Sequence, residues 1–138
     1  MASNFTHLSI TREPIGSPHM TQGSEWGSLL TFAGIVRGHE DGRPIRGIHY
    51  TAYEDMARTT LSRIARTGRD QFASHGLWIE HRLGFVPAGD PSLFLGIGTP
   101  HSKEGLEILS WYLRQVKTEI PIWKEPVSAN SPTQQAPI

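Results

Sequence analysis

The segment SLFLGIGTPHSKEGLEILSWYLRQVKTEIPIWKE (residues 92–125) decides the fold, because it holds a strand, a helix and a helix breaker in succession. Apolar and glycine residues at its start predict a strand over 92–98. The next part predicts a helix over 99–120, since apolar side chains recur there at helical spacing. That apolar stripe is formed by Leu106, Leu109, Leu113 and Val116.

The two ends of this helix carry the residues of greatest chemical interest. Thr99 is expected to cap its start, with Ser102 as the alternative cap. Pro121 lacks a backbone donor and clashes with the preceding turn, so the helix is expected to end before it. Lys117 therefore belongs to the last helical turn, and Lys124 lies beyond the break. The chain has only three lysines, against ten arginines.

The rest of the chain alternates between strand patterns and one more helical pattern. Apolar residues at helical spacing predict a helix over 54–76 that ends at Gly76. The charged stretch 37–47 is expected to be a mobile loop, and residues 87–90 (PAGD) a type II turn. Strands are predicted over residues 5–10, 27–36, 48–53 and 77–86, of which 27–36 is expected to be buried.

These elements predict the α+β class, with two main helices on one side of a mainly antiparallel sheet. We expect a single domain over residues 1–125. Residues 126–138 are rich in Pro, Ser and Gln and predict an irregular or disordered tail.

Composition excludes several classes of function. The 138 residues carry 13 basic and 13 acidic side chains, without the basic excess typical of a nucleic-acid binder. No apolar run is long enough to span a membrane, and the first twenty residues do not resemble a signal peptide. Without cysteine, the chain has no disulfide or thiolate metal site, which fits a cytoplasmic protein. The histidines lack metal-ligand spacing, so we predict no metal.

Several charged residues are candidates for binding or catalysis, although a structural or surface role explains His101 and Arg37 better when each is taken alone. His101 lies at a helix start, where backbone N–H groups attract anions. Arg37 directly follows a strand and opens a charged loop. Arg82 lies within a strand pattern, so it needs a partner such as Glu80, Asp90 or a ligand.

The lysines invite a chemical explanation. Arginine stays charged in proteins, whereas a lysine ammonium can lose its proton when it is desolvated or crowded by other cations. Near His101 and Arg37, Lys117 and Lys124 could therefore act as a base or nucleophile. The alternative is that both are ordinary surface lysines.

In combination, the motifs TFAGIVRGH, YTAYEDMA, EHRLGFVPAGD, GIGTPHS and YLRQVKTEIPIWKE resemble the large, catalytic subunit of molybdopterin synthase over residues 27–125. The resemblance implies an α/β hammerhead fold and a homodimer flanked by two small ubiquitin-like subunits, together a heterotetramer. Each small subunit inserts a Gly-Gly C-terminus that carries a thiocarboxylate. The implied enzyme is a sulfurtransferase of molybdenum cofactor biosynthesis, which converts cyclic pyranopterin monophosphate (precursor Z) into the molybdopterin dithiolene. It needs no metal or redox cofactor for this step.

The resemblance also implies roles for individual residues. Lys117 and Lys124 match the two pocket lysines and are the implied catalytic residues. Arg37 matches an anion-binding arginine and His101 the pocket histidine, and both are expected to bind phosphate. Arg82 matches the arginine of an H-R-x-G motif and is a further substrate-binding candidate.

Two departures from the family pattern support a different hypothesis. Ser102 stands where the family has arginine after the pocket histidine, and Lys103 is the nearest cation that could bind substrate in its place. No basic residue follows Lys124. The alternative is therefore a non-catalytic relative that binds a ubiquitin-like tail or a small phosphate ligand without turnover.

Overall fold

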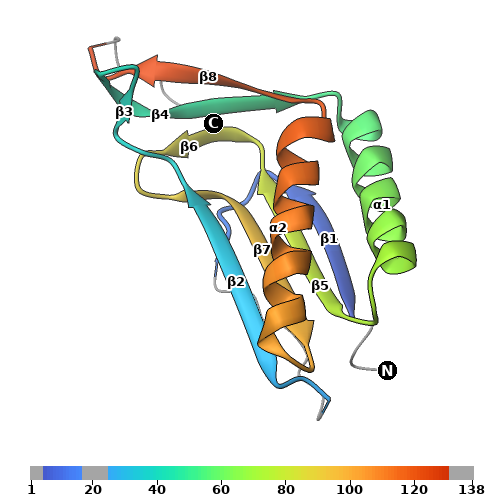
Figure 1. The fold of residues 1–138 in the computed structure, drawn as a ribbon. Helices are drawn as coiled ribbons and strands as arrows, with labels where there is room; N and C mark the ends of the chain where they lie inside the picture. The colour runs from blue at the N-terminus through green and yellow to red at the C-terminus, as the bar shows by residue number, and fades with distance from the viewer. Residues whose placement is uncertain (1–4, 17–24, 131–138) are drawn as a thin grey trace.

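The computed structural model of the chain describes residues 5–16 and 25–130 (Figure 1). In this part, two long helices cover one face of a four-stranded sheet, and a second group of strands lies across one end of it. The elements in order are β1 (Thr6–Thr11), β2 (Ser28–Ile35), β3 (His39–Glu40), β4 (Arg43–Ala52), α1 (Glu54–Gln71), β5 (Gly76–Arg82), β6 (Gly84–Pro87), β7 (Pro91–Thr99), α2 (Ser102–Glu119) and β8 (Ile122–Ser128).

The first sheet has the strand order β1-β5-β7-β2, in which only the β1–β5 pair is parallel. In the second group, β4 is the central strand and pairs antiparallel with β3, β6 and β8. The predicted α+β class, with two helices and a mainly antiparallel sheet, is confirmed.

The main core lies between the first sheet and the two helices. Alternate residues of β5 and β7 point to this side, because side chains along a strand alternate between faces. Each helix contributes one buried stripe to the same layer. Its most deeply buried members include Ile64, Leu77, Ile79, Leu95, Ile97 and Tyr112.

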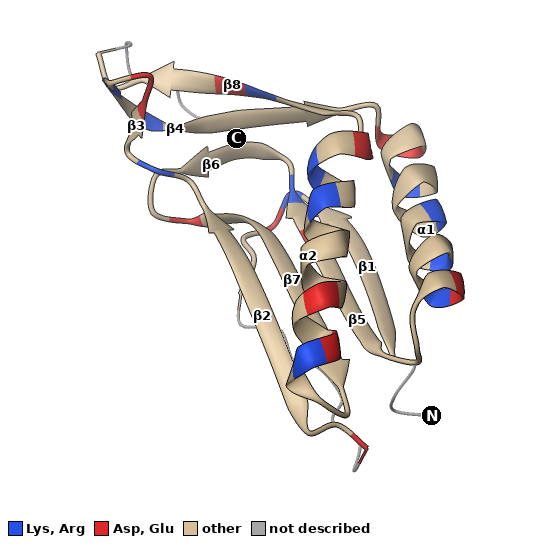
Figure 2. Cartoon of the chain, in the orientation of Figure 1, with Lys and Arg blue, Asp and Glu red and all other residues tan. Residues whose placement is uncertain are grey.

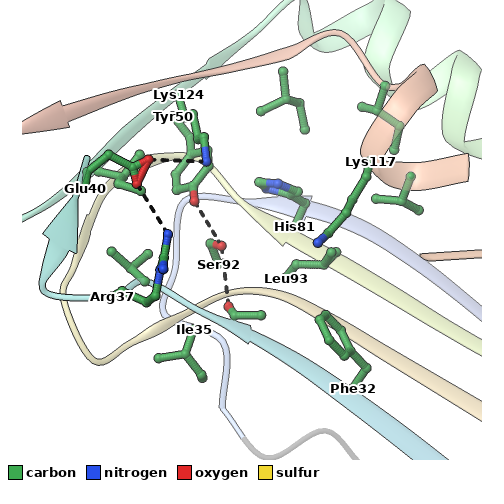
Figure 3. A pocket seen from close by; sticks show the side chains of 16 residues that line it. Phe32, Ile35, Arg37, Glu40, Tyr50, His81, Ser92, Leu93, Lys117 and Lys124 are labelled. Atoms are coloured by element: carbon green, nitrogen blue, oxygen red, sulfur yellow. Dashed lines mark hydrogen bonds and ion pairs between the residues drawn. The ribbon is translucent and has the colours of Figure 1, made fainter. Parts of the chain in front are cut away.

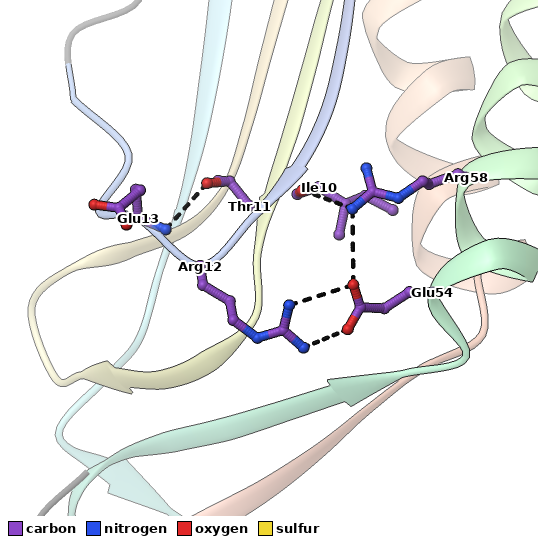
Figure 4. Close-up of polar contacts among 6 residues, drawn as sticks. All are labelled: Ile10, Thr11, Arg12, Glu13, Glu54 and Arg58. Carbon is purple, nitrogen blue, oxygen red and sulfur yellow. Dashed lines mark hydrogen bonds and ion pairs between the residues drawn. The ribbon is translucent and has the colours of Figure 1, made fainter. Parts of the chain in front are cut away.

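A cluster of charges fastens the end of β1 to the start of α1 (Figure 4). The carboxylate of Glu54 accepts hydrogen bonds from both Nη atoms of Arg12, and its Oε1 lies 3.7 Å from Nη2 of Arg58. Arg58 also donates to the carbonyl of Ile10 at 3.4 Å. The hydrogen bond from Arg12 lowers the pKa of Glu54. Glu54 also suits the first turn of α1, where the helix dipole favours an acidic side chain.

The helices differ from prediction at their ends. α1 ends at Gln71, so Gly76 does not terminate it and instead begins β5. α2 begins at Ser102 with His101 at the N-cap, so neither Thr99 nor Ser102 is the cap. Thr99 belongs to β7, where its hydroxyl donates to the His101 carbonyl at 2.7 Å.

Two strand predictions were also wrong. Residues 77–86 form two strands, because Gly84 has φ +85° and turns the chain from the first sheet into the second. Within residues 27–36 the strand is confirmed as β2, but of the predicted buried residues only Val36 is buried, because β2 is an edge strand whose residues alternate between half-buried and exposed. The predicted turn at 87–90 is confirmed, since Asp90 N–H donates to the Pro87 carbonyl and Gly89 has a positive φ.

The two predicted irregular segments contain strands. Residues 37–47 include the hairpin of β3 and β4, and the chain after Pro121 forms β8 on the edge of β4. β8 continues to Ser128 and so includes the first three residues of the expected tail, whereas residues 131–138 lie outside the described part. No helix in the described ranges is long and apolar enough to cross a membrane.

Candidate active site

A cavity of about 480 Å³ opens where the end of α2 meets β2, β4 and β8 (Figure 3). Its walls combine apolar side chains with polar and charged ones that reach in from several elements. Such a mixture of apolar walls and a few polar groups is typical of small-molecule sites. The polar and charged residues that line it are Arg37, Glu40, Tyr50, His81, Ser92, Lys117 and Lys124.

Lys117 and Lys124 line this same cavity from different elements. Lys117 lies in the last turn of α2, and the chain then turns at Pro121 and runs along β4 as β8. Lys124 is the register partner of Tyr50 on β4. Successive β8 side chains point to opposite faces, so Trp123 lies on the other side and packs edge-on against Tyr53, with ring centroids 4.8 Å apart.

Arg37 lines the cavity from the segment between β2 and β3, close to Glu40. Glu40 Oε2 lies 3.9 Å from Arg37 Nη2, and Glu40 Oε1 lies 3.8 Å from Lys124 Nζ. The two-residue turn after Glu40 is Asp41–Gly42, with φ 52° and 76°. Positive φ at both positions is the geometry of a tight hairpin turn, and Asp-Gly is a preferred sequence for it.

The inner wall of the cavity carries neutral polar groups. The Tyr50 hydroxyl donates to Ser92 Oγ at 3.2 Å, and Ser92 Oγ donates to the Gly34 carbonyl at 3.5 Å. The His81 ring packs edge-on against Tyr50, with centroids 5.3 Å apart. Burial lowers the pKa of His81, which therefore favours the neutral form.

Arg82 does not line the cavity. It follows His81 in β5 and so points to the opposite face of the sheet. There its guanidinium lies 3.4 Å from the carboxylate of Asp90, one of the partners proposed from the sequence. Only 12% of the Arg82 side chain is exposed, so within this chain it has the position of a structural ion pair.

His101 and Lys103 also lie away from the cavity. Both are exposed at the start of α2, whereas Lys117 lies at its end. Sixteen residues of helix separate His101 from Lys117, a rise of about 24 Å. The expected cluster of Arg37, His101, Lys117 and Lys124 is therefore not formed within one chain.

Glu40, Tyr50 and Ser92 were not anticipated from the sequence. The Asp-Gly pair after Glu40 was a signal for a hairpin that pairs Glu40 with Arg43, whereas Arg37 lies only three residues before Glu40 on the same arm. No comparable signal pointed to Tyr50 and Ser92, which lie 42 residues apart and meet only through the packing of β4 and β7. Among the described residues, no three His, Asp or Glu side chains gather closely enough to hold a metal ion.

Comparison with known proteins identifies the family. The family model described as "MoaE protein" matches residues 10–119. A molybdopterin synthase catalytic subunit from Arabidopsis thaliana is 34% identical over 75% of this chain and 52% of its own length. The chain thus spans about half the length of the first curated relatives that it matches.

Solved structures agree. Molybdopterin synthase from Staphylococcus aureus superposes with a TM-score of 0.82 at 25% identity, covering 88% of this chain and 91% of that one. A chain from the complex of subunits 1 and 2 of the molybdopterin-converting factor of Helicobacter pylori gives a TM-score of 0.63 at 26% identity, covering 78% and 74%. From the family match, the sequence similarity and the shared fold together, the chain belongs to the MoaE protein family.

Proposed function

We propose that this chain is the catalytic subunit of a molybdopterin synthase, and that Lys117 and Lys124 perform the sulfur transfer in the cavity described above. The observation that carries the proposal is that both lysines and Arg37 line one cavity, although they come from three different elements. The names of the relatives from Arabidopsis and Staphylococcus support the same activity.

The proposed substrates explain why Arg37, Lys117 and Lys124 are needed in the cavity. Both the pterin phosphate and the thiocarboxylate at the Gly-Gly end of a small ubiquitin-like subunit are anions, and cations are required to bring them together. When sulfur attacks the pterin side chain, a C–S bond forms and negative charge develops on oxygen, which fixed positive groups stabilise. Water then cleaves the acyl–sulfur bond, which leaves a carboxylate on the small subunit and the sulfur as a thiolate on the pterin side chain. The displaced oxygen leaves as water, and a second thiocarboxylate supplies the second sulfur of the dithiolene in the same way.

Each cation then has a distinct task. Lys117 contacts the thiocarboxylate or the acyl intermediate, and Lys124 acts as acid and base or holds the pterin. Arg37 binds the phosphate. The proposed small-subunit partner has a parallel in the Helicobacter pylori structure, which is described as a complex of two subunits. We place the reaction in the cytoplasm.

A homodimer would add His101 and Lys103 to this site. β2 is an edge strand without a charged residue (Figure 2), and such an edge offers unpaired backbone groups to another strand. If two copies paired β2 antiparallel about a two-fold axis, the Ser28 end of one strand would face the Ile35 end of the other. Ser28 pairs with Thr99, close to the start of α2, whereas Ile35 lines the cavity. The partner's His101 and the partner's Lys103 would then lie beside this chain's cavity.

The experiment combines a thiocarboxylated small subunit with precursor Z and measures molybdopterin. Lys117→Ala is expected to lose most of the product, whereas Arg114→Ala, an exposed cation one turn earlier on α2 that does not line the cavity, is expected to retain it. Equal and substantial product from Lys117→Ala and wild type would contradict the role of Lys117.

If wild type and Lys117→Ala formed equally little product, the catalytic proposal would fail. Binding of the small subunit or of phosphate without turnover would then support the alternative, a non-catalytic relative. The observation in favour of that alternative is Ser102, which stands where the family has a further arginine.

A further inference from the structure

We propose that Glu40 is the counter-ion of Arg37 and Lys124 in the cavity and that it determines which anions bind there. Glu40 is the only carboxylate among the residues that line the cavity, where it lies between two cations. Figure 3 shows Arg37 and Lys124 reaching toward its two oxygens from different elements. An anion that enters must replace Glu40 as the ion-pair partner of these two cations.

The geometry of the two ion pairs permits such an exchange. Both distances, 3.9 Å to Arg37 and 3.8 Å to Lys124, are those of loose ion pairs, longer than hydrogen bonds. Arg37 and Lys124 are 82% and 59% exposed, so their guanidinium and ammonium can reorient toward a ligand. Ion pairs of this exposure are weak and are readily exchanged for others.

The side chain of Glu40 is less free to move than those of Arg37 and Lys124. Its side chain is only 21% exposed, and its backbone is held by pairing with Arg43 and by the tight turn at Asp41–Gly42. The carboxylate therefore stays close to any anion bound between Arg37 and Lys124. Like charges so close repel each other, and this repulsion weakens the binding of small, highly charged anions.

Lys117 adds a preference for extended ligands over compact anions. No ion pair joins it to Glu40, and it extends into the cavity from the far wall formed by α2 (Figure 3). A ligand long enough to reach Lys117 as well as Arg37 compensates for the repulsion by Glu40, whereas a compact anion held at Arg37 and Lys124 does not. Glu40 thereby favours extended substrates over free phosphate and pyrophosphate.

The test measures binding of inorganic pyrophosphate by calorimetry at low salt to wild type, Glu40→Gln and Asp41→Asn. Glu40→Gln is expected to bind about fivefold to tenfold more tightly, the effect of removing one charge a few ångströms from the ligand. Asp41→Asn removes the same charge from the adjacent, exposed turn residue, and asparagine tolerates the positive φ there. This variant is expected to bind like wild type.

Equal or weaker binding by Glu40→Gln, including no detectable binding by either protein, would overturn the proposal, as would equal gains in both variants. The inference rests on the proposed function only for the identity of the natural substrate. A tighter Glu40→Gln complex in a protein that forms no molybdopterin would therefore refute the proposed function and leave the role of Glu40 intact.

Discussion

Replacing Tyr112 by phenylalanine is expected to destabilise the fold by leaving a buried hydrogen-bond acceptor without a partner. Tyr112 and His75 are both fully buried, and the Tyr112 hydroxyl lies 2.8 Å from Nε2 of His75. The other ring nitrogen, Nδ1, lies 2.7 Å from the Ala73 carbonyl. A carbonyl can only accept, so Nδ1 carries the hydrogen and Nε2 of the neutral ring accepts from Tyr112.

The size of the effect follows from this geometry. Removing the hydroxyl leaves Nε2 buried and unsatisfied, which costs about 1–3 kcal/mol. For a chain of 138 residues this corresponds to a fall in Tm of about 3–12 °C. Tyr112 packs α2 against α1, and Lys117 follows on the same helix. The position of Lys117 in the cavity therefore depends on this contact.

Thermal and urea unfolding of wild type, Tyr112→Phe, His75→Leu and the double variant would measure the effect. The double variant is expected to be more stable than the sum of the single losses, since it removes both polar partners. A Tyr112→Phe protein with the Tm of wild type, or strictly additive losses, would refute the reasoning.

The burial of His75 also makes stability depend on pH. Burial lowers the pKa of His75 below its ordinary value of 6.5. Below that pH the unfolded chain binds a proton that the folded protein does not, so the free energy of unfolding falls as the pH decreases. His75→Gln is expected to lose less stability than wild type between about pH 6.5 and pH 5. The loss is not abolished, because burial also lowers the pKa of His81.

Two further predictions concern helix packing and association. Gly68→Ala is expected to lower the free energy of unfolding by about 1–3 kcal/mol, because the added Cβ would lie 1.9 Å from the Tyr112 hydroxyl; Gly16→Ala, with nothing within 4 Å, is the control. Both are measured by urea unfolding, and equal losses would contradict this packing. Thr31→Lys places a charge on the exposed side of β2 and is expected to give monomers in sedimentation velocity. The control is Thr59→Lys, at an exposed position on α1, which is expected to leave the dimer intact. A persisting Thr31→Lys dimer would show that the subunits associate elsewhere.

Much of the fold followed from periodicity and chain breakers. The helical spacing of Leu106, Leu109, Leu113 and Val116 predicted α2, and Pro121 predicted its end. The stripe itself was wrong in part, because α2 buries Ile108, Tyr112 and Val116, and Leu106 is 60% exposed. The wrong predictions lie where a backbone turn or a neighbouring strand determines the structure. Gly84 turns one apolar run into two strands, and β8 exists because the edge of β4 is available to pair with it.

By itself, the sequence determined the class of fold, the presence of the two helices and the separation of Lys117 from Lys124 by a break at Pro121. These are local properties, set by side-chain spacing and backbone sterics. It also carried the motifs from which the family was inferred.

Only the tertiary structure decided which residues meet. Pairing of β8 with β4 brings Lys124 to the cavity of Lys117 and to within 3.8 Å of Glu40. The rigid length of α2 keeps His101 at the far end of the molecule, although it precedes Lys117 by only sixteen residues. Contacts between distant segments depend on sheet register and helix direction, which local patterns do not specify.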